Sequence, residues 1–229
     1  AFGEAKAHLP TERPCVVVGN PVRQEFLTAT RAEARKKLGL DDAFTIFSVG
    51  GSSGANAINK MAADIMAWHC KEGKINHIHG YGKHGRENFP KMLEERGIDL
   101  NDYPRIQARE YIDDMALWTA AADLVISRAG AITISELEVL GKPSILVPYP
   151  YAAENHQYHN AKVLEDHRAA ILVEEKDYSK EAIIERIEEL YHSPEKLEEL
   201  GKNAASLAVY DTTRQIYDRI MEELSKGRS

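Results

Sequence analysis

The chain has 229 residues, and its 29 Lys and Arg against 36 Asp and Glu give a formal net charge of −7. With 43% apolar and 28% charged residues, the composition is that of a globular protein and excludes disordered and fibrous classes. The sequence has no apolar run near the roughly 20 residues that span a bilayer. Its net negative charge argues against nonspecific nucleic-acid binding, which needs clustered Lys and Arg.

Cysteine content and the first residue give two further expectations. Cys15 and Cys70 match no zinc-binding or CxxC spacing, which is typical of a protein in a reducing compartment. Residue 1 is Ala rather than Met, and we therefore expect the chain to be a piece of a longer protein.

Short apolar runs alternate with stretches of helical periodicity along most of the chain. The apolar runs are 15–18, 44–49, 75–79, 105–108, 123–127, 144–147 and 170–173. The helical stretches between them are about 28–38, 54–70, 87–96, 113–122, 131–140 and 154–166. Near-continuous apolar runs indicate strands buried on both faces, and strand–helix alternation demands parallel crossovers. We therefore predict an α/β fold with a Rossmann-like, doubly wound parallel sheet of six or seven strands.

The end of the sequence is predicted to be helical. Residues 174–200 carry most of the excess negative charge, and their apolar positions recur at helical spacing. We interpret the charges as the solvated faces of two helices broken at Ser193-Pro194, with an acidic partner-binding surface as the alternative. A last helix, about 211–224, begins with Asp211 as N-cap and carries an apolar stripe.

The loop over residues 50–54 is the strongest candidate site. Gly50 and Gly51 end an apolar run, Ser52 and Ser53 follow, and Gly54 opens a helical stretch. Glycines let a backbone approach a ligand closely, and a helix N-terminus presents unpaired N–H groups to an anion. The loop matches neither the Walker A nor the GxGxxG pattern. We predict that it binds phosphate; a tight turn without a ligand is the alternative.

A second strand-to-helix loop starts at Ser127 and reaches Glu136. Glu136 lies in the first turns of the predicted helix, where an acid can simply complement the helix dipole. The functional interpretation is that backbone amides here hold a diphosphate while the Glu136 carboxylate accepts hydrogen bonds from ribose hydroxyls.

Other polar groups carry weaker signals. Residues 79–83 follow the third run, and Lys83 is a candidate cation near phosphate. His77 and His79 share a strand face, but without further ligands we predict no metal site. Asp113 and Asp114 are interpreted as helix caps. No GxSxG elbow or Ser/His/Asp constellation indicates a covalent nucleophile.

Five motifs in order resemble the MurG family. They are residues 19–23 (GNPVR), 50–55 (GGSSGA), 111–115 (YIDDM), 127–136 (SRAGAITISE) and 156–161 (HQYHNA). That family transfers N-acetylglucosamine (GlcNAc) from UDP-GlcNAc to undecaprenyl-diphospho-muramoyl-pentapeptide, lipid I, at the cytoplasmic face of the bacterial membrane. The resemblance implies the C-terminal, donor-binding half of a two-domain GT-B glycosyltransferase of peptidoglycan synthesis.

The resemblance also implies a UDP-GlcNAc site. Arg23 would contact the nucleotide, Ser52 a phosphate, and the backbone of Ile112 the uracil edge. Glu136 would bind the ribose hydroxyls and Gln157 the GlcNAc hydroxyls. The expected substrate-binding residues are Arg23, Ser52, Ile112, Ala131, Ile132, Thr133, Ile134, Ser135, Glu136 and Gln157, with Gly50, Gly51, Ser53 and Gly54 as the phosphate loop. Ser53 and His156 stand where glutamine is usual in the family, which leaves polar groups at both positions.

The domain boundaries follow from the same resemblance. Residues 1–14 are expected to be a remnant of a preceding acceptor domain, 15–210 the UDP-GlcNAc-binding domain, and 211–229 a helix that crosses back to the missing domain. Lipid I, the membrane surface and the general base would be contacted or supplied by that missing domain, so no catalytic residue is assigned here. No metal or other cofactor is expected, because amides and the helix dipole can stabilise the leaving diphosphate.

Two alternatives remain open at this level. The chain can be part of another UDP-sugar enzyme of the same fold, such as an epimerase or a glycolipid glycosyltransferase. It can also be a non-catalytic nucleotide-sugar-binding subunit with a separate partner chain.

Overall fold

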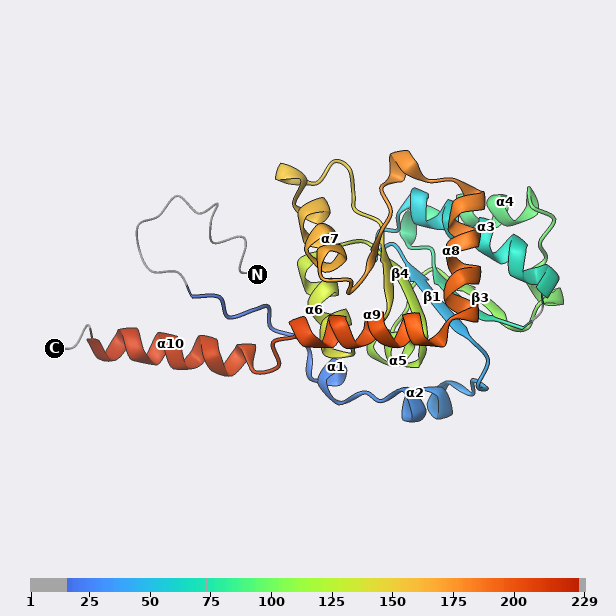
Figure 1. The fold of residues 1–229 in the computed structure, drawn as a ribbon. Helices are drawn as coiled ribbons and strands as arrows, with labels where there is room; N and C mark the ends of the chain where they lie inside the picture. Colours follow the sequence, from blue (N-terminus) through green and yellow to red (C-terminus); the bar gives the residue numbers. More distant parts are fainter. Residues whose placement is uncertain (1–15, 73, 227–229) are drawn as a thin grey trace.

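The computed structural model describes residues 16–72 and 74–226. The expected domain remnant at 1–14 and Cys15 lie outside the described residues. Figure 1 shows a sheet enclosed by helices, with one further helix extending away from this body.

The described residues form a six-stranded, entirely parallel sheet. Its strands are β1 (Thr45–Val49), β2 (Asn76–Gly80), β3 (Ile106–Arg109), β4 (Leu124–Ser127), β5 (Ser144–Leu146) and β6 (Ile171–Leu172). The order across the sheet is β3-β2-β1-β4-β5-β6, so the direction of winding reverses between β1 and β4. Val49 is in register with Gly80 on one side and Ser127 on the other. The carboxyl ends of these strands are therefore level, and ligands of such sheets bind at this reversal point.

Helices cover both faces of the sheet, as the doubly wound fold requires. They are α1 (Gln24–Thr28), α2 (Arg31–Leu38), α3 (Asn56–Glu72), α4 (Asn88–Glu94), α5 (Met115–Ala121), α6 (Ala131–Val139), α7 (His156–Asp166), α8 (Lys180–His192), α9 (Pro194–Leu207) and α10 (Thr212–Lys226). Short 3-10 turns are η2 (Lys83–Gly85), η3 (Leu100–Asp102), η4 (Ala153–Asn155) and η5 (Glu175–Asp177).

Side chains that alternate along the central strands build two separate cores. Ile46 and Ile126 point to one face, where residues of α3 and α8 pack on them. Phe47 and Val125 point to the other face, against residues of α5, α6 and α7. Because both faces are buried, the strands read as continuous apolar runs in the sequence.

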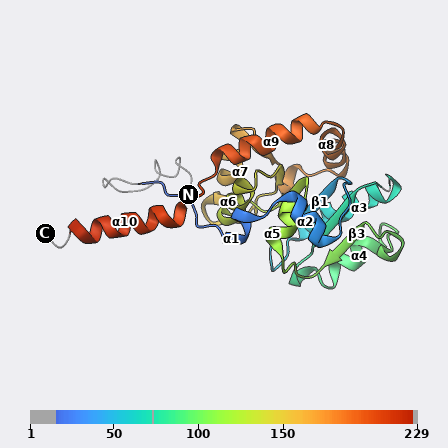
Figure 2. The same cartoon turned by 90° about the horizontal axis from the view of Figure 1, so that it is seen from below.

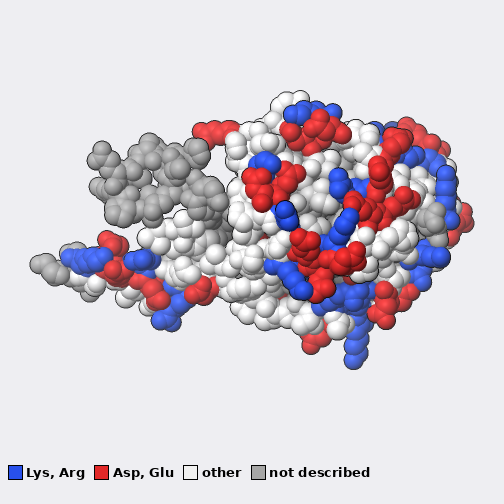
Figure 3. Space-filling model, in the orientation of Figure 1, with Lys and Arg blue, Asp and Glu red and all other residues white. Residues whose placement is uncertain are grey.

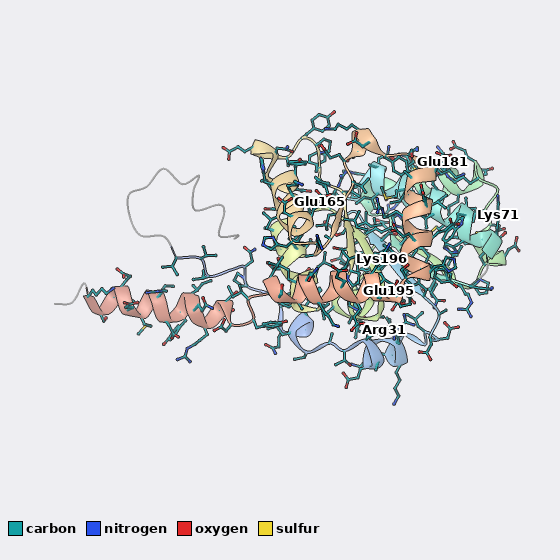
Figure 4. All side chains as sticks on the ribbon, viewed as in Figure 1. Arg31, Lys71, Glu165, Glu181, Glu195 and Lys196 are labelled. Carbon is teal, nitrogen blue, oxygen red and sulfur yellow. The ribbon has the colours of Figure 1, made fainter. Side chains whose placement is uncertain are left out.

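The acidic C-terminal region forms two helices, as predicted, with the break at Ser193. Ile187 and Leu190 of α8 are buried in the core. Figure 3 shows acidic and basic side chains interspersed over the face that carries α8 and α9. The labelled Glu181, Glu195 and Lys196 of Figure 4 are all exposed. This mixture supports solvated helix faces rather than an acidic partner-binding surface.

Helix α10 extends away from the sheet and its covering helices in both views (Figures 1 and 2). Thr212 is its buried residue, whereas four apolar side chains are about half exposed: Tyr217 57%, Ile220 54%, Met221 48% and Leu224 57%. The stripe predicted from the sequence exists, and no described element covers it. Asp211 directly precedes the helix, and its carboxylate accepts a hydrogen bond from the Gln215 side chain at 2.7 Å.

Two local predictions were wrong, and one helix begins later than expected. Residues 16–18 form no strand, and Val16 and Val17 are 52% and 41% exposed. The helix expected over about 28–38 is α2, which begins at Arg31, because the Thr30 hydroxyl caps it by accepting from the Glu33 N–H. Asp114 occupies the N-cap position of α5, but its side chain makes no capping hydrogen bond.

Candidate functional site

The glycine-rich loop at residues 50–54 joins β1 to the 17-residue helix α3. Gly51 and Gly54 have φ of +85° and +84°, a backbone conformation that favours glycine. The Gly54 N–H donates to the Gly51 carbonyl at 3.0 Å and closes a tight turn. Ser52 and Ser53 are exposed at the tip of this turn. The loop thus places the exposed hydroxyls of Ser52 and Ser53 at the N-terminus of a long helix, as the sequence predicted.

The segment after β2 packs directly against this loop. A side chain at Gly82 would collide with the backbone of Gly54. The two segments therefore lie so close together that only glycine fits at position 82. The Lys83 N–H donates to the Ser52 carbonyl at 3.1 Å, and the His84 N–H donates to the Ser53 carbonyl at 2.9 Å. Lys83 is therefore beside the loop, as expected from its place after the strand.

A cavity of about 180 Å³ lies where four strand ends meet. Its walls come from the loops after β1, β2, β3 and β4 and from the starts of α5 and α6. The lining residues are Val49, Gly51, Ser52, Gly80, Glu110, Tyr111, Ile112, Met115, Ser127, Arg128 and Thr133. Four of the expected residues, Gly51, Ser52, Ile112 and Thr133, are thus brought together at the reversal point of the sheet.

Ile112 packs its side chain inward and is 4% exposed. It lies against Gly80, where an added Cβ would be 2.9 Å from Ile112 Cγ1. Any contact of Ile112 with a ligand must therefore come from its backbone, as the family resemblance implies. Tyr111 beside it is 60% exposed at the mouth of the cavity.

The segment 131–136 forms the first turns of α6, and its members face different ways. Ile134 is fully buried in the core, its N–H bonds to the Gly130 carbonyl, and it does not line the cavity. Ile132 is 60% exposed. The Asn20 side-chain amide donates to Ser135 Oγ at 3.1 Å and to the Ala131 carbonyl at 3.4 Å. The chain before α1 is thereby attached to the start of α6.

Arg23 and Glu136 form an ion pair, with Arg23 Nη2 3.1 Å from Glu136 Oε1. Glu136 is 8% exposed, and burial raises the pKa of its carboxyl while Arg23 opposes that rise. The Arg23 guanidinium also lies 4.8 Å above the Phe26 ring. Both residues were expected to contact the nucleotide, but their contact with each other was not predicted.

Gln157 does not line the cavity. It lies in the first turn of α7, and its side-chain oxygen accepts a hydrogen bond from the Tyr149 N–H at 3.0 Å. Between these residues, Glu154 and Asn155 have φ of +51° and +52°, so the loop bends sharply before the helix. His156 Nδ1 is 2.9 Å from the Ala153 carbonyl. In this conformation Gln157 supports the loop after β5.

Arg128 lines the cavity but was not among the residues expected from the sequence. Its Nη1 donates to the carbonyls of Val147 and Pro148 at 3.1 and 3.0 Å and forms an ion pair with Glu175 at 2.6 Å. Its position directly after a strand, inside the Ser127-to-Glu136 loop, was the available signal. Arg128 ties the ends of β4, β5 and β6 together.

The two histidines on β2 are fully buried and bonded to Ser48, whose Oγ lies 2.8 Å from His77 Nε2 and from His79 Nδ1. Burial lowers the pKa of His79 to about 3.

Across the described ranges, no cluster of three or more His, Cys, Asp or Glu side chains is arranged to hold a metal ion. None of the helices at 16–72 and 74–226 is long and apolar enough to cross a bilayer.

A larger cavity of about 580 Å³ lies between α4 and β3. Its walls are mainly apolar, with Phe89, Leu93 and Ile98 among them, and it contains none of the expected nucleotide-binding residues. The smaller cavity remains the candidate site, because it combines the glycine-rich loop with the level strand ends.

Comparison with known proteins gives one family. The glycosyltransferase family 28 C-terminal domain matches residues 45–216. The chain is 38% identical over 230 positions to the UDP-N-acetylglucosamine–N-acetylmuramyl-(pentapeptide) pyrophosphoryl-undecaprenol N-acetylglucosamine transferase of Acetivibrio thermocellus, covering 100% of this chain and 61% of the relative. A relative of the same name from Desulforamulus reducens is 40% identical over 192 residues, 83% of this chain and 52% of the relative. The chain thus spans about three fifths or less of the length of these relatives.

Solved structures agree with this assignment. Acinetobacter baumannii MurG matches with a TM-score of 0.72 and 26% identity over 97% of this chain and 63% of that one. The UDP-GlcNAc 2-epimerase of Neisseria meningitidis matches with a TM-score of 0.59 and 14% identity, over 83% of this chain and 48% of that one. The second likeness concerns the fold alone. The resemblance drawn from the five motifs and the Rossmann-like fold class is confirmed.

Proposed function

Because the chain belongs to the glycosyltransferase family 28 C-terminal domain family, we propose that it is the donor-binding half of an inverting glycosyltransferase. The proposed reaction moves GlcNAc from UDP-GlcNAc to undecaprenyl-diphospho-N-acetylmuramoyl-pentapeptide, the reaction named by the curated relatives. The observation that carries the proposal is the cavity at the winding reversal, where the glycine-rich loop, Ile112 and Thr133 meet.

In the proposed complex, the diphosphate lies over residues 50–54. Backbone N–H groups and the positive end of the α3 dipole face its negative charge, and the Ser52 hydroxyl donates to a phosphate oxygen. The exposed, glycine-rich turn supports this arrangement, because residues 51–53 at its tip are open to a ligand. The backbone of Ile112 reads the uracil edge across the cavity.

The ribose is proposed to lie beside the Arg23–Glu136 pair, with the Glu136 carboxylate accepting bonds from the sugar hydroxyls. Gln157 is proposed to contact the GlcNAc hydroxyls, which requires that its side chain exchange the Tyr149 N–H for the ligand. The loop after β5 would move in that step, because the Tyr149 bond now holds it.

The chemistry that this chain supplies is leaving-group stabilisation. An acceptor hydroxyl attacks the anomeric carbon, a new carbon–oxygen bond forms, and the bond to the β-phosphate oxygen breaks with inversion. UDP leaves with the bonding electrons, and the amides of residues 50–54 stabilise the charge that develops on its β-phosphate. The proton of the acceptor hydroxyl passes to a general base expected in the part of the relatives that this chain does not span.

The domain division is part of the same proposal. Residues 15–210 would bind the donor, and α10 would return to an acceptor domain that precedes residue 1 in a longer chain. The uncovered apolar stripe of α10 supports this. Lipid I and the cytoplasmic membrane surface would be contacted through that acceptor domain.

Calorimetry with nucleotides tests the proposal. The chain is expected to bind UDP and UDP-GlcNAc more tightly than ADP, because Ile112 reads uracil and the phosphate loop serves all three ligands. An affinity for ADP equal to that for UDP would contradict the nucleotide assignment.

A transfer assay tests whether donor binding and acceptor activation belong to separate domains. The chain alone is expected to form no product from UDP-GlcNAc and a lipid acceptor, because acceptor binding and the general base are assigned to the other domain. Product formation by the pure chain would overturn that division while leaving donor binding intact.

A further inference from the structure

A buried hydrogen-bonded chain of side chains lies behind the glycine-rich loop. Its members are Ser48, Asn59, His77 and His79, and each is at most 2% exposed. His77 Nε2 and His79 Nδ1 each lie 2.8 Å from Ser48 Oγ. His79 Nε2 lies 3.1 Å from Asn59 Oδ1, and Asn59 Nδ2 donates to the Tyr81 carbonyl at 3.1 Å.

The Asn59 end of this hydrogen-bonded series has a definite direction. The Tyr81 carbonyl can only accept, so it faces the Asn59 amide nitrogen, and Asn59 Oδ1 then faces His79 Nε2, which must carry a proton to donate to it. The Ser48 carbonyl is also only an acceptor and lies 3.1 Å from His79 Nδ1, so a neutral ring can donate to one of these two oxygens but not to both. Burial lowers the pKa values of His77 and His79, which favours neutral rings. We assign the Nε2–H form, which bonds Asn59 and leaves Nδ1 to accept from the Ser48 hydroxyl, whose oxygen accepts from His77 Nε2–H.

The series of hydrogen bonds ends at the Tyr81 carbonyl, in the segment that packs against the phosphate loop at residues 50–54. Tyr81 precedes Gly82, and a side chain at Gly54 would collide with the Tyr81 carbonyl oxygen itself. The next two N–H groups, of Lys83 and His84, bond to the carbonyls of Ser52 and Ser53. A shift of the Tyr81 carbonyl must therefore be transmitted to residues 52–54, because no space separates the two segments.

We propose that Asn59 and His79 are positioning residues for the diphosphate: the directional chain from His77 to the Tyr81 carbonyl fixes the loop at 50–54 in its binding conformation. The inference rests on the proposed function, since it assigns these groups to the same UDP site. Neither side chain touches the ligand. Their effect reaches it through the Tyr81–Gly82 backbone.

The test is the Asn59→Asp variant, which replaces the Nδ2 donor by a carboxyl oxygen facing the Tyr81 carbonyl. UDP and uridine are titrated by NMR into the wild-type chain and the variant. Loss of one buried donor is expected to weaken UDP binding about tenfold. Uridine binding should change less than about twofold, because uridine has no phosphate on the loop. A merely structural role would lower both affinities together.

Asn76→Asp is the matched control. Asn76 is 4% exposed at the amino end of β2, where its amide donates to Asp41 at 3.0 Å, far along the strand from the loops. The same buried substitution there should lower thermal stability while leaving UDP affinity unchanged. If Asn59→Asp does not fold, Ser48→Ala removes only the hydroxyl that bonds His77 and His79 and is expected to weaken UDP binding about threefold.

Two results would overturn the inference. One is an unchanged UDP affinity, or an equal loss for UDP and uridine, in a folded variant. The other is a wild-type His79 ring with its proton on Nδ1, measured by ¹⁵N NMR, since the chain requires the Nε2–H form. A wild-type chain that binds no UDP would instead refute the proposed function, and the ring measurement would still decide the direction of the hydrogen bonds.

Discussion

Arg23 and Glu136 are 113 positions apart in the chain, yet Arg23 Nη2 lies 3.1 Å from Glu136 Oε1. The guanidinium side chain is 58% exposed and the carboxylate side chain only 11%, so the acid is held at the start of α6 while the base remains open to solvent. The Asn20 bonds to Ala131 and Ser135 attach the same two segments. The residues before α1 therefore form one wall of the region assigned to the ribose.

Glu136→Gln tests the ribose assignment. The variant keeps the side-chain shape but loses the charge, and hydrogen bonds to charged groups are worth about 1.5–3 kcal/mol. We expect UDP binding to weaken by about 1–3 kcal/mol in calorimetry. Binding of 2′,3′-dideoxyuridine diphosphate should change little, because it lacks the hydroxyls that the carboxylate would bind.

Glu138→Gln is the control for this measurement. Glu138 is 5% exposed on the same helix, but two residues further on, so it points to a different side of α6. Its substitution should leave UDP binding unchanged. If Glu136→Gln folds and binds UDP as the wild type does, Glu136 is only a helix-start charge paired with Arg23.

Gly82→Ala is expected to disrupt the phosphate loop. An added Cβ would collide with the Gly54 backbone, and the φ of +69° is itself unfavourable for alanine. Gly97→Ala separates the two effects, because Gly97 has a φ of +67° but open space around it. Urea unfolding should give a loss of about 1 kcal/mol for the control and at least about 2 kcal/mol more for Gly82→Ala. Equal losses would mean that the loops are not in tight contact.

The sheet was predictable because both of its faces are buried. Ile46 and Phe47 point to opposite cores, so the strand shows as a continuous apolar run in the sequence. The same signal failed at Val16 and Val17, where an apolar run pairs with no strand of the described residues and remains exposed. Strand formation depends on a partner edge, which local residue patterns do not contain.

The site was predictable as a set of loops but not as a set of contacts. Parallel strands end at one edge, so the loops carrying Ser52, Ile112 and Thr133 had to lie near one another. The contacts of Arg128 with Val147 and Pro148 depend on how separate loops fold over that edge. The bond between Gln157 and Tyr149 likewise depends on a sharp bend that the sequence does not specify.

The buried histidines predict a loss of stability on mild acidification. Burial lowers the pKa of His69 to about 4 and of His79 to about 3, from 6.5. The unfolded chain binds protons below pH 6.5 that the folded chain does not, so the free energy of unfolding falls as pH falls. Between pH 7 and pH 5 each of the two rings should remove roughly 2 kcal/mol. Urea unfolding at the two pH values measures this.

Two variants separate the contribution of the histidines to this pH dependence from that of the carboxyl groups, which also titrate. His69→Leu removes one buried ring and should reduce the difference in unfolding free energy between pH 7 and pH 5. His84→Gln removes an exposed ring and should not change that difference. If His69→Leu shows the same pH dependence as the wild type, the His69 ring binds its proton as readily in the folded chain as in the unfolded chain.

Helix α10 is expected to exchange its amide hydrogens faster than the sheet. Its polar face has local ion pairs, such as Arg214 with Asp218 at 2.8 Å and Arg219 with Glu222 at 2.8 Å. Such pairs stabilise a helix by only about 0.2–0.5 kcal/mol each. The apolar stripe around Ile220 is uncovered in the described structure, so little tertiary packing resists local opening. Hydrogen exchange across 212–226, compared with β1, measures the difference.

Substitutions show whether the apolar stripe of α10 is free of contacts with this domain or packs on it. Ile220→Ser with Leu224→Ser should leave the unfolding free energy of the body unchanged, because both side chains are more than half exposed. Leu190→Ala on α8, where the side chain is 2% exposed, should cost about 2–5 kcal/mol. When a preceding acceptor domain is present, the stripe should become protected, and the serine pair should then destabilise the longer protein. Sheet-like protection of α10 in a monomeric sample of this chain would mean that the helix needs no other domain, and the proposed crossing would be wrong.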